Sequence, residues 1–466
     1  MTTFSFSPRA LLPLAALAFL SSCASLQPSA PPEAAYVVLG EGGAPVARAV
    51  TTSATCPALA LDDRMVPMTV RAPLRPIAPR PGAGGKPQPP STAVLTCEAA
   101  IAPGTIRASV GAQALPLPRA ALERIVVIGD TGCRIKNQEV QDCNDPKEFP
   151  FARIAAVAAR WKPDLVVHVG DFHYREDACP ANRPGCAGSP WGYGWDAWNA
   201  DFFAPARALL GAAPWVVVRG NHESCARAGQ GWWRFLDPRP LAPGRDCDLP
   251  ANDAAGDYSD PYAVPLGGGA QLIVFDSANT TYKGFAPGDP RVGIYADTWR
   301  KVDALARQAS YNIAVDHHPL FAFGASRNAK TGAVSLFGGD AGLLQAFGAL
   351  DQGFLPPSVS MLLSGHVHLW EQTSFSSGHP TQFVSGFSGT AEDIVPLPAS
   401  VAPGVTPANG AVVEHMSSWI DGFGFMTMER TGAEAWLVKV WDRDGRERNT
   451  CQVTGRKSQC ELAQVR

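Results

Sequence analysis

The sequence predicts an α/β protein built on a largely parallel sheet. Short, solidly apolar runs recur along the chain, and stretches with helical periodicity lie between them. Apolar runs bounded by turn residues are typical of strands that are buried on both faces. Their alternation with helices indicates an α/β sheet. The predicted strands are 125–128, 165–167, 215–218, 272–275, 313–315 and 361–363, and the intervening helical patterns include 151–161 and 298–308.

Further segments flank this α/β unit, which we place at 119–430. Residues 36–118 hold short β-like runs and a Pro- and Gly-rich loop at 73–90, which predicts a separate, small β-rich module of sandwich type. Residues 431–466 are expected to form closing strands and a disulfide-stapled tail. With 46% hydrophobic residues the chain can form a sizeable core, and its net charge of −3 gives no reason to expect a nucleic-acid partner.

The N-terminus carries the features of an export signal. Arg9 precedes an apolar run at 10–20, which is too short for a membrane span of about 20 residues. The following Leu20-Ser21-Ser22-Cys23 resembles a bacterial lipobox. This resemblance predicts a signal peptide over 1–22, a lipid on Cys23 and a tether over 23–35, with the chain held at the outer membrane and facing the periplasm or the cell surface. The alternative is an ordinary signal peptide cleaved a few residues later.

The cysteines agree with export. Apart from Cys23 their number is even, which behind an export signal indicates disulfides. A thiolate metal site is disfavoured, because no two cysteines show the C-x-x-C spacing common in zinc sites. Sequence alone does not fix the connectivity. The close spacings favour the sequential pairs 56–97, 133–143, 179–186, 225–247 and 451–460.

Five of the apolar runs are followed directly by potential metal ligands. In open α/β sheets, sites form at the carboxyl ends of strands, where glycine lets the backbone turn sharply. Asp oxygens and His nitrogens suit Fe, Mn and Zn, and an Asn carbonyl can ligate without adding charge. Five such endings on separate strands therefore predict a metal centre. They are Gly129-Asp130, Gly170-Asp171, Gly220-Asn221-His222, Asp316-His317-His318 and Gly365-His366-Val367-His368.

Two adjacent cations would suit the hydrolysis of a phosphate ester. A carboxylate can bridge two metal ions about 3.5–4 Å apart, which lower the pKa of a shared water and clamp the attacking and leaving oxygens. Phosphate esters are anionic and repel hydroxide, so clustered positive charge supplies what the reaction lacks in water.

The motifs resemble those of the calcineurin-like metallophosphoesterases over about 124–430, and Gly170-Asp171-Phe172-His173-Tyr174 resembles the purple acid phosphatase branch. The resemblance implies a four-layer α/β/β/α sandwich and a dinuclear metal centre. A Tyr174 phenolate would favour Fe(III) at the first site, with Fe, Zn or Mn at the second. The implied ligands are Asp130, Asp171, Tyr174 and His368 for the first metal, and Asp171, Asn221, His317 and His366 for the second, with Asp171 bridging.

The resemblance also implies roles for residues that do not bind metal. His222 is expected to contact the phosphate and help to protonate the leaving oxygen. His317 is preferred over His318 as the ligand, because the pattern His-x-Pro places the ligand two residues before Pro319. The remaining candidates for supporting or substrate-facing roles are His318, Asp316, which departs from the usual small residue and could orient a neighbouring histidine, His173 at the rim, and Glu223, which would orient its neighbours.

These expectations combine into a metal-dependent phosphohydrolase that uses an activated hydroxide and no covalent intermediate. A phosphomonoesterase of the acid phosphatase type is favoured because of Tyr174. The alternatives are a phosphodiesterase or nucleotidase with similar ligands, and a surface lipoprotein that binds metal or phosphate without turnover. The aromatic stretch 178–198 is either a disulfide-stapled hydrophobic loop or a wall that selects the organic part of the ester.

Overall fold

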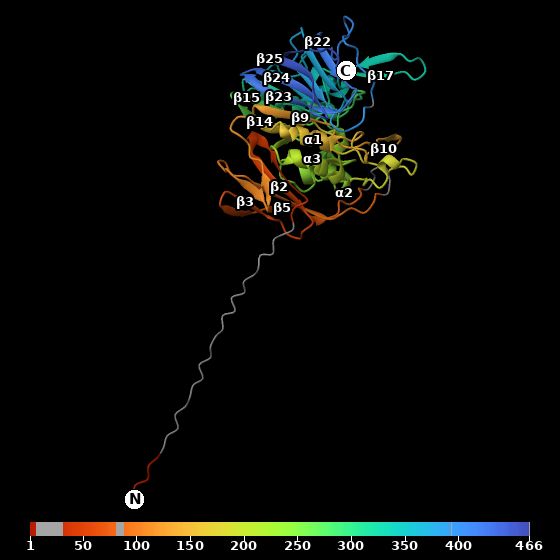
Figure 1. Cartoon of the computed structure of the whole chain (residues 1–466). Coiled ribbons are helices and arrows are strands. Elements are labelled where there is room, and N and C mark those ends of the chain that lie inside the picture. Colours follow the sequence, from red (N-terminus) through yellow and green to blue (C-terminus); the bar gives the residue numbers. More distant parts are fainter. Residues whose placement is uncertain (6–30, 81–87, 393, 466) are drawn as a thin grey trace.

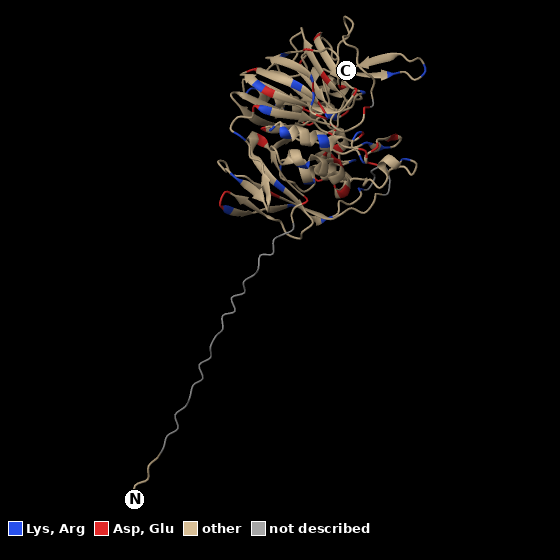
Figure 2. Ribbon diagram, viewed as in Figure 1, with Lys and Arg blue, Asp and Glu red and all other residues tan. Residues whose placement is uncertain are grey.

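A computed structural model describes residues 1–5, 31–80, 88–392 and 394–465. Two large sheets face each other and helices cover their outer faces, so the layers run α/β/β/α as expected (Figure 1). The apolar run at 10–20 and Cys23 lie outside the described residues. Within the described ranges, every helix is too short or too polar to span a membrane. Figure 2 shows acidic and basic residues interspersed over the folded part of the chain.

The larger sheet has 11 strands and a parallel centre. The parallel strands are β9 (Arg124–Ile128), β12 (Leu165–His168), β13 (Trp215–Val217) and β1 (Ala34–Leu39). Antiparallel strands extend it on one side through β23 (Gly424–Gly432), β24 (Ala435–Asp442), β25 (Glu447–Thr454) and β26 (Lys457–Cys460), and on the other through β2 (Pro45–Thr51), β6 (Val94–Ala100) and β5 (Thr69–Arg75).

The smaller sheet has seven strands, of which four consecutive neighbours are parallel. In spatial order they are β14 (Tyr262–Gly267), β15 (Ala270–Val274), β16 (Tyr311–Val315), β19 (Val359–Ser364), β21 (Thr381–Ser385), β20 (Trp370–Phe375) and β22 (Val413–Trp419). All six strands predicted from apolar runs are present, as β9, β12, β13, β15, β16 and β19.

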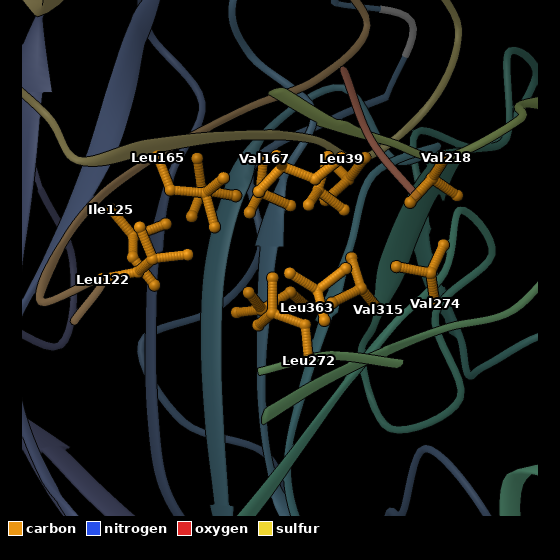
Figure 3. Close-up of a cluster of buried hydrophobic side chains, with 14 of the residues drawn as sticks. Leu39, Leu122, Ile125, Leu165, Val167, Val218, Leu272, Val274, Val315 and Leu363 are labelled. Carbon is orange, nitrogen blue, oxygen red and sulfur yellow. The ribbon is translucent and has the colours of Figure 1, made fainter. Parts of the chain in front are cut away.

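The main core lies between the two sheets. Figure 3 shows Ile125, Leu165 and Val167 of the larger sheet in one row, facing Leu272 and Leu363 of the smaller sheet. Alternate residues of the same strands point outward beneath helices, which explains why the runs are apolar throughout. The larger sheet is covered by α1 (Phe151–Arg160), α2 (Trp195–Trp198) and α3 (Ala204–Leu210), and the smaller by α6 (Arg291–Ala306) and α7 (Ala341–Gly348).

The N-terminal region is β-rich as predicted, but it does not stand apart from the α/β unit. Strand β1 pairs in parallel with β13 through Val38 and Trp215, so β1, β2, β6 and β5 extend the larger sheet. The expectation of a separate module therefore needs correction, because half of this region completes the central sheet. Its other strands, β4 (Arg64–Pro67), β3 (Ala58–Leu61), β7 (Ala108–Val110) and β8 (Gln113–Leu115), form a sheet of their own.

Short elements and disulfides shape the loops. All five sequential disulfides favoured by the cysteine spacing are present. Two hairpins stand near the metal-ligand motifs, formed by β10 (Ile135–Lys136) with β11 (Glu139–Val140) and by β17 (Gly324–Arg327) with β18 (Val334–Phe337). Helical turns are η1 (Glu41–Gly43), η2 (Pro184–Cys186), η3 (Asn199–Phe203), η4 (Asn221–Glu223), α4 (Gly229–Gly231), η5 (Trp232–Leu236), η6 (Pro250–Asn252) and α5 (Asp253–Gly256).

Candidate metal centre

The predicted ligands of the first metal converge on the hydroxyl of Tyr174. This oxygen lies 2.8 Å from Oδ2 of Asp171, 3.0 Å from Oδ1 of Asp130 and 2.9 Å from Nε2 of His368. Nε2 of His368 is in turn 3.2 Å from Oδ1 of Asp130. Asp130 follows β9, Asp171 and Tyr174 follow β12, and His368 follows β19, so the two sheets contribute to one cluster.

The predicted ligands of the second metal form an adjoining cluster. Oδ1 of Asn221 lies 3.2 Å from Nε2 of His317 and 3.1 Å from Nδ1 of His366. Nε2 of His317 is also 3.2 Å from Oδ2 of Asp171, the oxygen that contacts Tyr174. Asp171 therefore contacts both clusters, and it is the residue for which the resemblance implies a bridging role.

The donor set fits metal ions. Lone-pair donors face one another here at 2.8–3.2 Å, which is close to the roughly 3 Å between neighbouring ligand atoms that each lie about 2.1 Å from one ion at right angles. The ligand atoms of Asp130, Asp171 and His317 lie within 4.8 Å of one another, and so do those of His317, His318 and His366. Two carboxylates, a phenol, an amide oxygen and imidazoles suit Fe, Zn or Mn.

The backbone at the ligands is held in an uncommon conformation. Asp130, Asp171 and His366 have φ angles of 52°, 56° and 69°, in the left-handed region that non-glycine residues rarely adopt. Such conformations persist where the surrounding structure enforces them, and they gather at functional sites. Two glycines make room for the ligands. A Cβ atom on Gly170 would lie 2.4 Å from Nδ1 of His317, and one on Gly220 would lie 2.1 Å from Oδ1 of Asp171.

Electrostatics also show that the cluster suits cations. Burial and the carboxylates of Asp171 and Asp130 raise the pKa of Tyr174 well above its ordinary value. Burial likewise raises the pKa of Asp130. Burial disfavours negative charge on both side chains, and for Tyr174 the neighbouring carboxylates add to this effect; a bound cation would favour the ionised forms instead.

Buried partners hold two of the ligands. Nδ1 of His317 lies 2.8 Å from the carbonyl of Val169, which leaves Nε2 directed at the cluster. The expectation that Asp316 orients a histidine needs correction, because its Oδ1 accepts a 2.5 Å hydrogen bond from Ser364 instead. Glu223, which is expected to orient its neighbours, contacts the backbone of the ligand loops. Its carboxylate accepts hydrogen bonds from four backbone amides, including those of Asp171 at 3.0 Å and Gly220 at 3.0 Å.

His222 lies beside the cluster rather than within it. Its Nε2 is 3.9 Å from Oδ2 of Asp171, and its ring lies 3.8 Å from that of Tyr174. Nδ1 is 2.7 Å from Oε1 of Glu176, and Glu176 also pairs with Arg227. Burial and the charge of Arg227 lower the pKa of His222 to about 4. His222 is thus held through one ring nitrogen, with the other facing the ligands.

The remaining candidates occupy different places. His318 packs against His366 with ring centroids 4.2 Å apart, and its Nδ1 lies 3.2 Å from the hydroxyl of Ser277. His173 does not lie at the rim as proposed from the sequence. Its side chain is buried, with its ring 5.6 Å from that of Tyr193 and 5.5 Å from that of Trp198, because the second half of the stretch 178–198 packs into the hydrophobic core. The expected alternative of an aromatic wall is not what forms the cavity.

A cavity of about 340 Å³ opens beside the ligands, and several of the residues that line it were not predicted from the sequence. Arg134 lines it, with one guanidinium nitrogen 2.7 Å from Nδ1 of His368. Lys136, Phe337 and Ile394 line it as well. None of these four residues belongs to a strand-end motif, and the nearest signal is that Arg134 and Lys136 follow shortly after Asp130 in the sequence.

Comparisons with known proteins agree with this geometry. A family model described as calcineurin-like phosphoesterase matches residues 123–369. No curated protein matches the sequence significantly. Among solved structures, the chain is similar to the purple acid phosphatase PPD1 from yellow lupin (Lupinus luteus) seeds, with a TM-score of 0.52 and 14% identity over 90% of this chain and 74% of that chain. It is also similar to PhoD, with a TM-score of 0.52 and 12% identity over 93% and 92%. At such identities the likeness shows the fold alone.

Proposed function

Because the chain belongs to the calcineurin-like phosphoesterase family, we propose that it is a phosphomonoesterase of the acid phosphatase type that works with two metal ions. One observation carries the proposal. The hydroxyl of Tyr174 lies 2.8–3.0 Å from ligand atoms of Asp130, Asp171 and His368, so that a phenol occupies a ligand position at the first site. A phenolate is a hard anion, which favours Fe(III) there, with Fe, Zn or Mn at the second site.

The residues would divide the work as follows. Two bound cations would lower the pKa of a shared water and offset the negative charge of the phosphate. Asp171 would bridge them, since its carboxylate is common to both clusters. The first cation would be held also by Asp130, Tyr174 and His368, and the second also by Asn221, His317 and His366.

His222 would serve the leaving group. Its Nδ1 is fixed by Glu176 at 2.7 Å, so Nε2 faces the ligands and can donate a proton to the departing alkoxide oxygen. The Glu176 carboxylate favours the protonated ring, but burial and the charge of Arg227 outweigh it and lower the pKa of His222 to about 4, so this proton donation would operate at acid pH. In the same displacement, an oxygen from water would form the new P–O bond as the bond to the alkoxide breaks, so that the alcohol leaves with the proton from His222 and inorganic phosphate remains.

A combined measurement tests this proposal. Protein purified without chelator is expected to contain two metal ions per chain, one of them iron, and to show a visible phenolate-to-iron absorption. Tyr174→Phe should abolish that absorption, and a retained colour would point to another chromophore. Wild-type protein should hydrolyse phosphomonoesters faster than diesters. A preference for diesters would favour a phosphodiesterase, and two bound metals without hydrolysis would favour a binding protein.

We further propose that the protein is exported and lipid-anchored, with Cys23 as the acylated residue and the membrane as a partner through the anchor only. The sequence Leu20-Ser21-Ser22-Cys23 supports this placement. Cys23→Ala should move the protein from the membrane fraction of a bacterial host to the soluble fraction. Unchanged membrane attachment of that variant would contradict the anchor.

A further inference from the structure

Two hairpins of different chemistry line the cavity beside the ligand cluster. Hairpin β10–β11 brings Lys136 and Glu139, and hairpin β17–β18 brings Phe337. Val367 and Ile394 extend the apolar part of the lining. Figure 1 shows β10 and β17 projecting on the same side of the molecule. The cavity thus offers one charged and one apolar environment within reach of the same phosphate site.

Lys136 lies in the charged part of the cavity lining. Arg134 pairs with Glu139 at 3.1 Å, and Arg227 pairs with Glu176. Among the described carboxylates, none forms an ion pair with Lys136, which is half-buried. Burial and the like charges of Arg227 and Arg134 lower the pKa of Lys136, against the opposing effect of the Glu176 and Asp171 carboxylates. An anion that enters the cavity would supply the missing partner.

Phe337 is the apolar counterpart. Its side chain is about half exposed at 47%, although it lines a cavity next to polar ligands. The ring lies across Gly324, its cross-strand partner, where a Cβ atom would be only 2.1 Å from the ring carbons. The absence of a side chain at Gly324 therefore allows the Phe337 ring to pack in this position. An apolar group of a bound ligand that covers this exposed ring would gain about 25 cal/mol of binding free energy for each Å² of apolar surface removed from water.

We infer that the substrate is a phosphomonoester dianion with an apolar organic group, in which Lys136 binds the phosphate charge and Phe337 contacts the organic group. This inference rests on the proposed function and deepens it. A monoester carries a second negative charge that a diester lacks, so Lys136 would favour monoesters. Phe337 would favour large organic groups over small ones. The two residues act on different parts of the substrate, and their effects should separate.

The test crosses two variants with three substrates. Lys136→Met should raise KM about tenfold for both phenyl phosphate and methyl phosphate, since one ion pair of about 1.4 kcal/mol corresponds to a factor of ten. It should change kcat/KM for the diester diphenyl phosphate less than twofold. Phe337→Ala should lower kcat/KM about fivefold or more for phenyl phosphate and leave methyl phosphate within twofold.

Both control variants lie on hairpin β17–β18. Lys330→Met removes an exposed lysine from the loop between β17 and β18, and Val334→Ala shortens an exposed apolar residue of β18 outside the cavity lining. Both should match wild type on all three substrates. Thermal unfolding and metal content of every variant confirm that the fold and the centre are intact.

Two results would overturn the inference. An equal loss on the diester in Lys136→Met would show a general electrostatic effect, and an equal loss on methyl phosphate in Phe337→Ala would show a structural one. Failure of the proposed function is distinguishable, because wild-type protein would then hydrolyse diphenyl phosphate faster than the two monoesters, or would turn over none of the substrates. In that case, dissociation constants for phenyl phosphate and methyl phosphate from calorimetry should still show the same pattern across the variants, and equal constants would refute it.

Discussion

The carboxylate of Glu223 accepts a 3.0 Å hydrogen bond from the backbone nitrogen of Asp171. The same oxygen accepts from Gly220 at 3.0 Å, and the other oxygen accepts from Phe172 at 2.9 Å and His173 at 3.2 Å. One buried side chain therefore ties the loop after β12 to the loop after β13. These loops carry the bridging carboxylate and the amide ligand, so their relative position depends on this carboxylate.

Glu223→Gln tests that dependence with almost no change in volume. The amide group turns one acceptor into a donor, which then faces two backbone N–H groups that have no other buried partner. We expect the free energy of unfolding to fall by about 1–3 kcal/mol and the metal content to fall with it. Urea titration and elemental analysis measure the two effects. Glu123→Gln, at an exposed position, serves as the control, and unchanged metal content in Glu223→Gln would contradict the role.

Asn221→Ala and His366→Ala should each remove the second metal. Their ligand atoms lie 3.1 Å apart, and neither residue contacts the Tyr174 hydroxyl around which the first cluster forms. We expect metal content near one per chain and turnover reduced by about 10³-fold or more, since both attacking and leaving oxygens lose their clamp. His415→Ala, which removes a histidine outside the cluster, should retain two metals. Near wild-type turnover in either ligand variant would refute the assignment.

His222→Ala should separate chemistry from metal binding. The imidazole lies beside the ligands, with Nε2 3.9 Å from Oδ2 of Asp171, so both metals should remain. Loss of a positioned general acid typically slows the chemical step about 10²–10⁴-fold. The loss should be smaller for substrates with good leaving groups, such as p-nitrophenyl phosphate, than for alkyl phosphates. Loss of a metal in this variant would show instead that His222 is a ligand.

The sequence could predict the ligand cluster because each ligand follows a strand that is apolar on both faces. The end of β12 determines the position of Asp171, and the end of β16 determines that of His317. These positions depend little on the conformation of the loops that follow. Side-chain direction was harder to predict. His173 is next to Phe172 in the metal motif, yet its ring packs between Tyr193 and Trp198, because that choice depends on a segment folded beneath it.

Long-range pairing also left no local signal. Strand β1 joins the central sheet through Val38 and Trp215, and nothing in either run specifies its partner. Phe337 was not identified for a related reason. Its place at the cavity depends on the β17–β18 hairpin, in which the Phe337 ring packs over Gly324 on the opposite strand. No sequence motif marks this cross-strand pair.

Arg71 of β5 shows why the N-terminal strands matter to the whole fold. Its guanidinium donates to the backbone carbonyls of Trp233, Asp237 and Arg239 and pairs with Glu98 at 2.8 Å. Arg71→Met would remove the guanidinium donor from the carbonyls of Trp233 and Arg239 and one of the two arginines paired with Glu98, and we expect the free energy of unfolding to fall by about 3–5 kcal/mol. Urea titration measures it. Arg64→Met, on the exposed strand β4, should change stability by less than about 0.5 kcal/mol, and equal effects would refute the role.

Glu371 of β20 should make stability depend on pH. Both of its oxygens accept from the backbone nitrogen of Phe323, at 3.0 and 3.1 Å, and burial raises the pKa of this carboxyl well above its ordinary value. The folded protein therefore holds the proton more tightly than the unfolded chain, where the pKa is about 4.3. The stabilising contribution is fully present below the unfolded pKa and is lost as pH rises through the folded pKa.

Glu371→Gln keeps the shape of the side chain and removes the ionisation. We expect wild type and variant to have similar free energies of unfolding near pH 4, and the variant to become the more stable as pH rises, by about 1.4 kcal/mol for each unit of pKa difference. Urea titrations at pH 4.5, 6 and 8 measure the gap. Glu434→Gln, at an exposed position, should follow wild type throughout. A gap that stays constant across the three pH values would show that packing rather than ionisation separates the proteins.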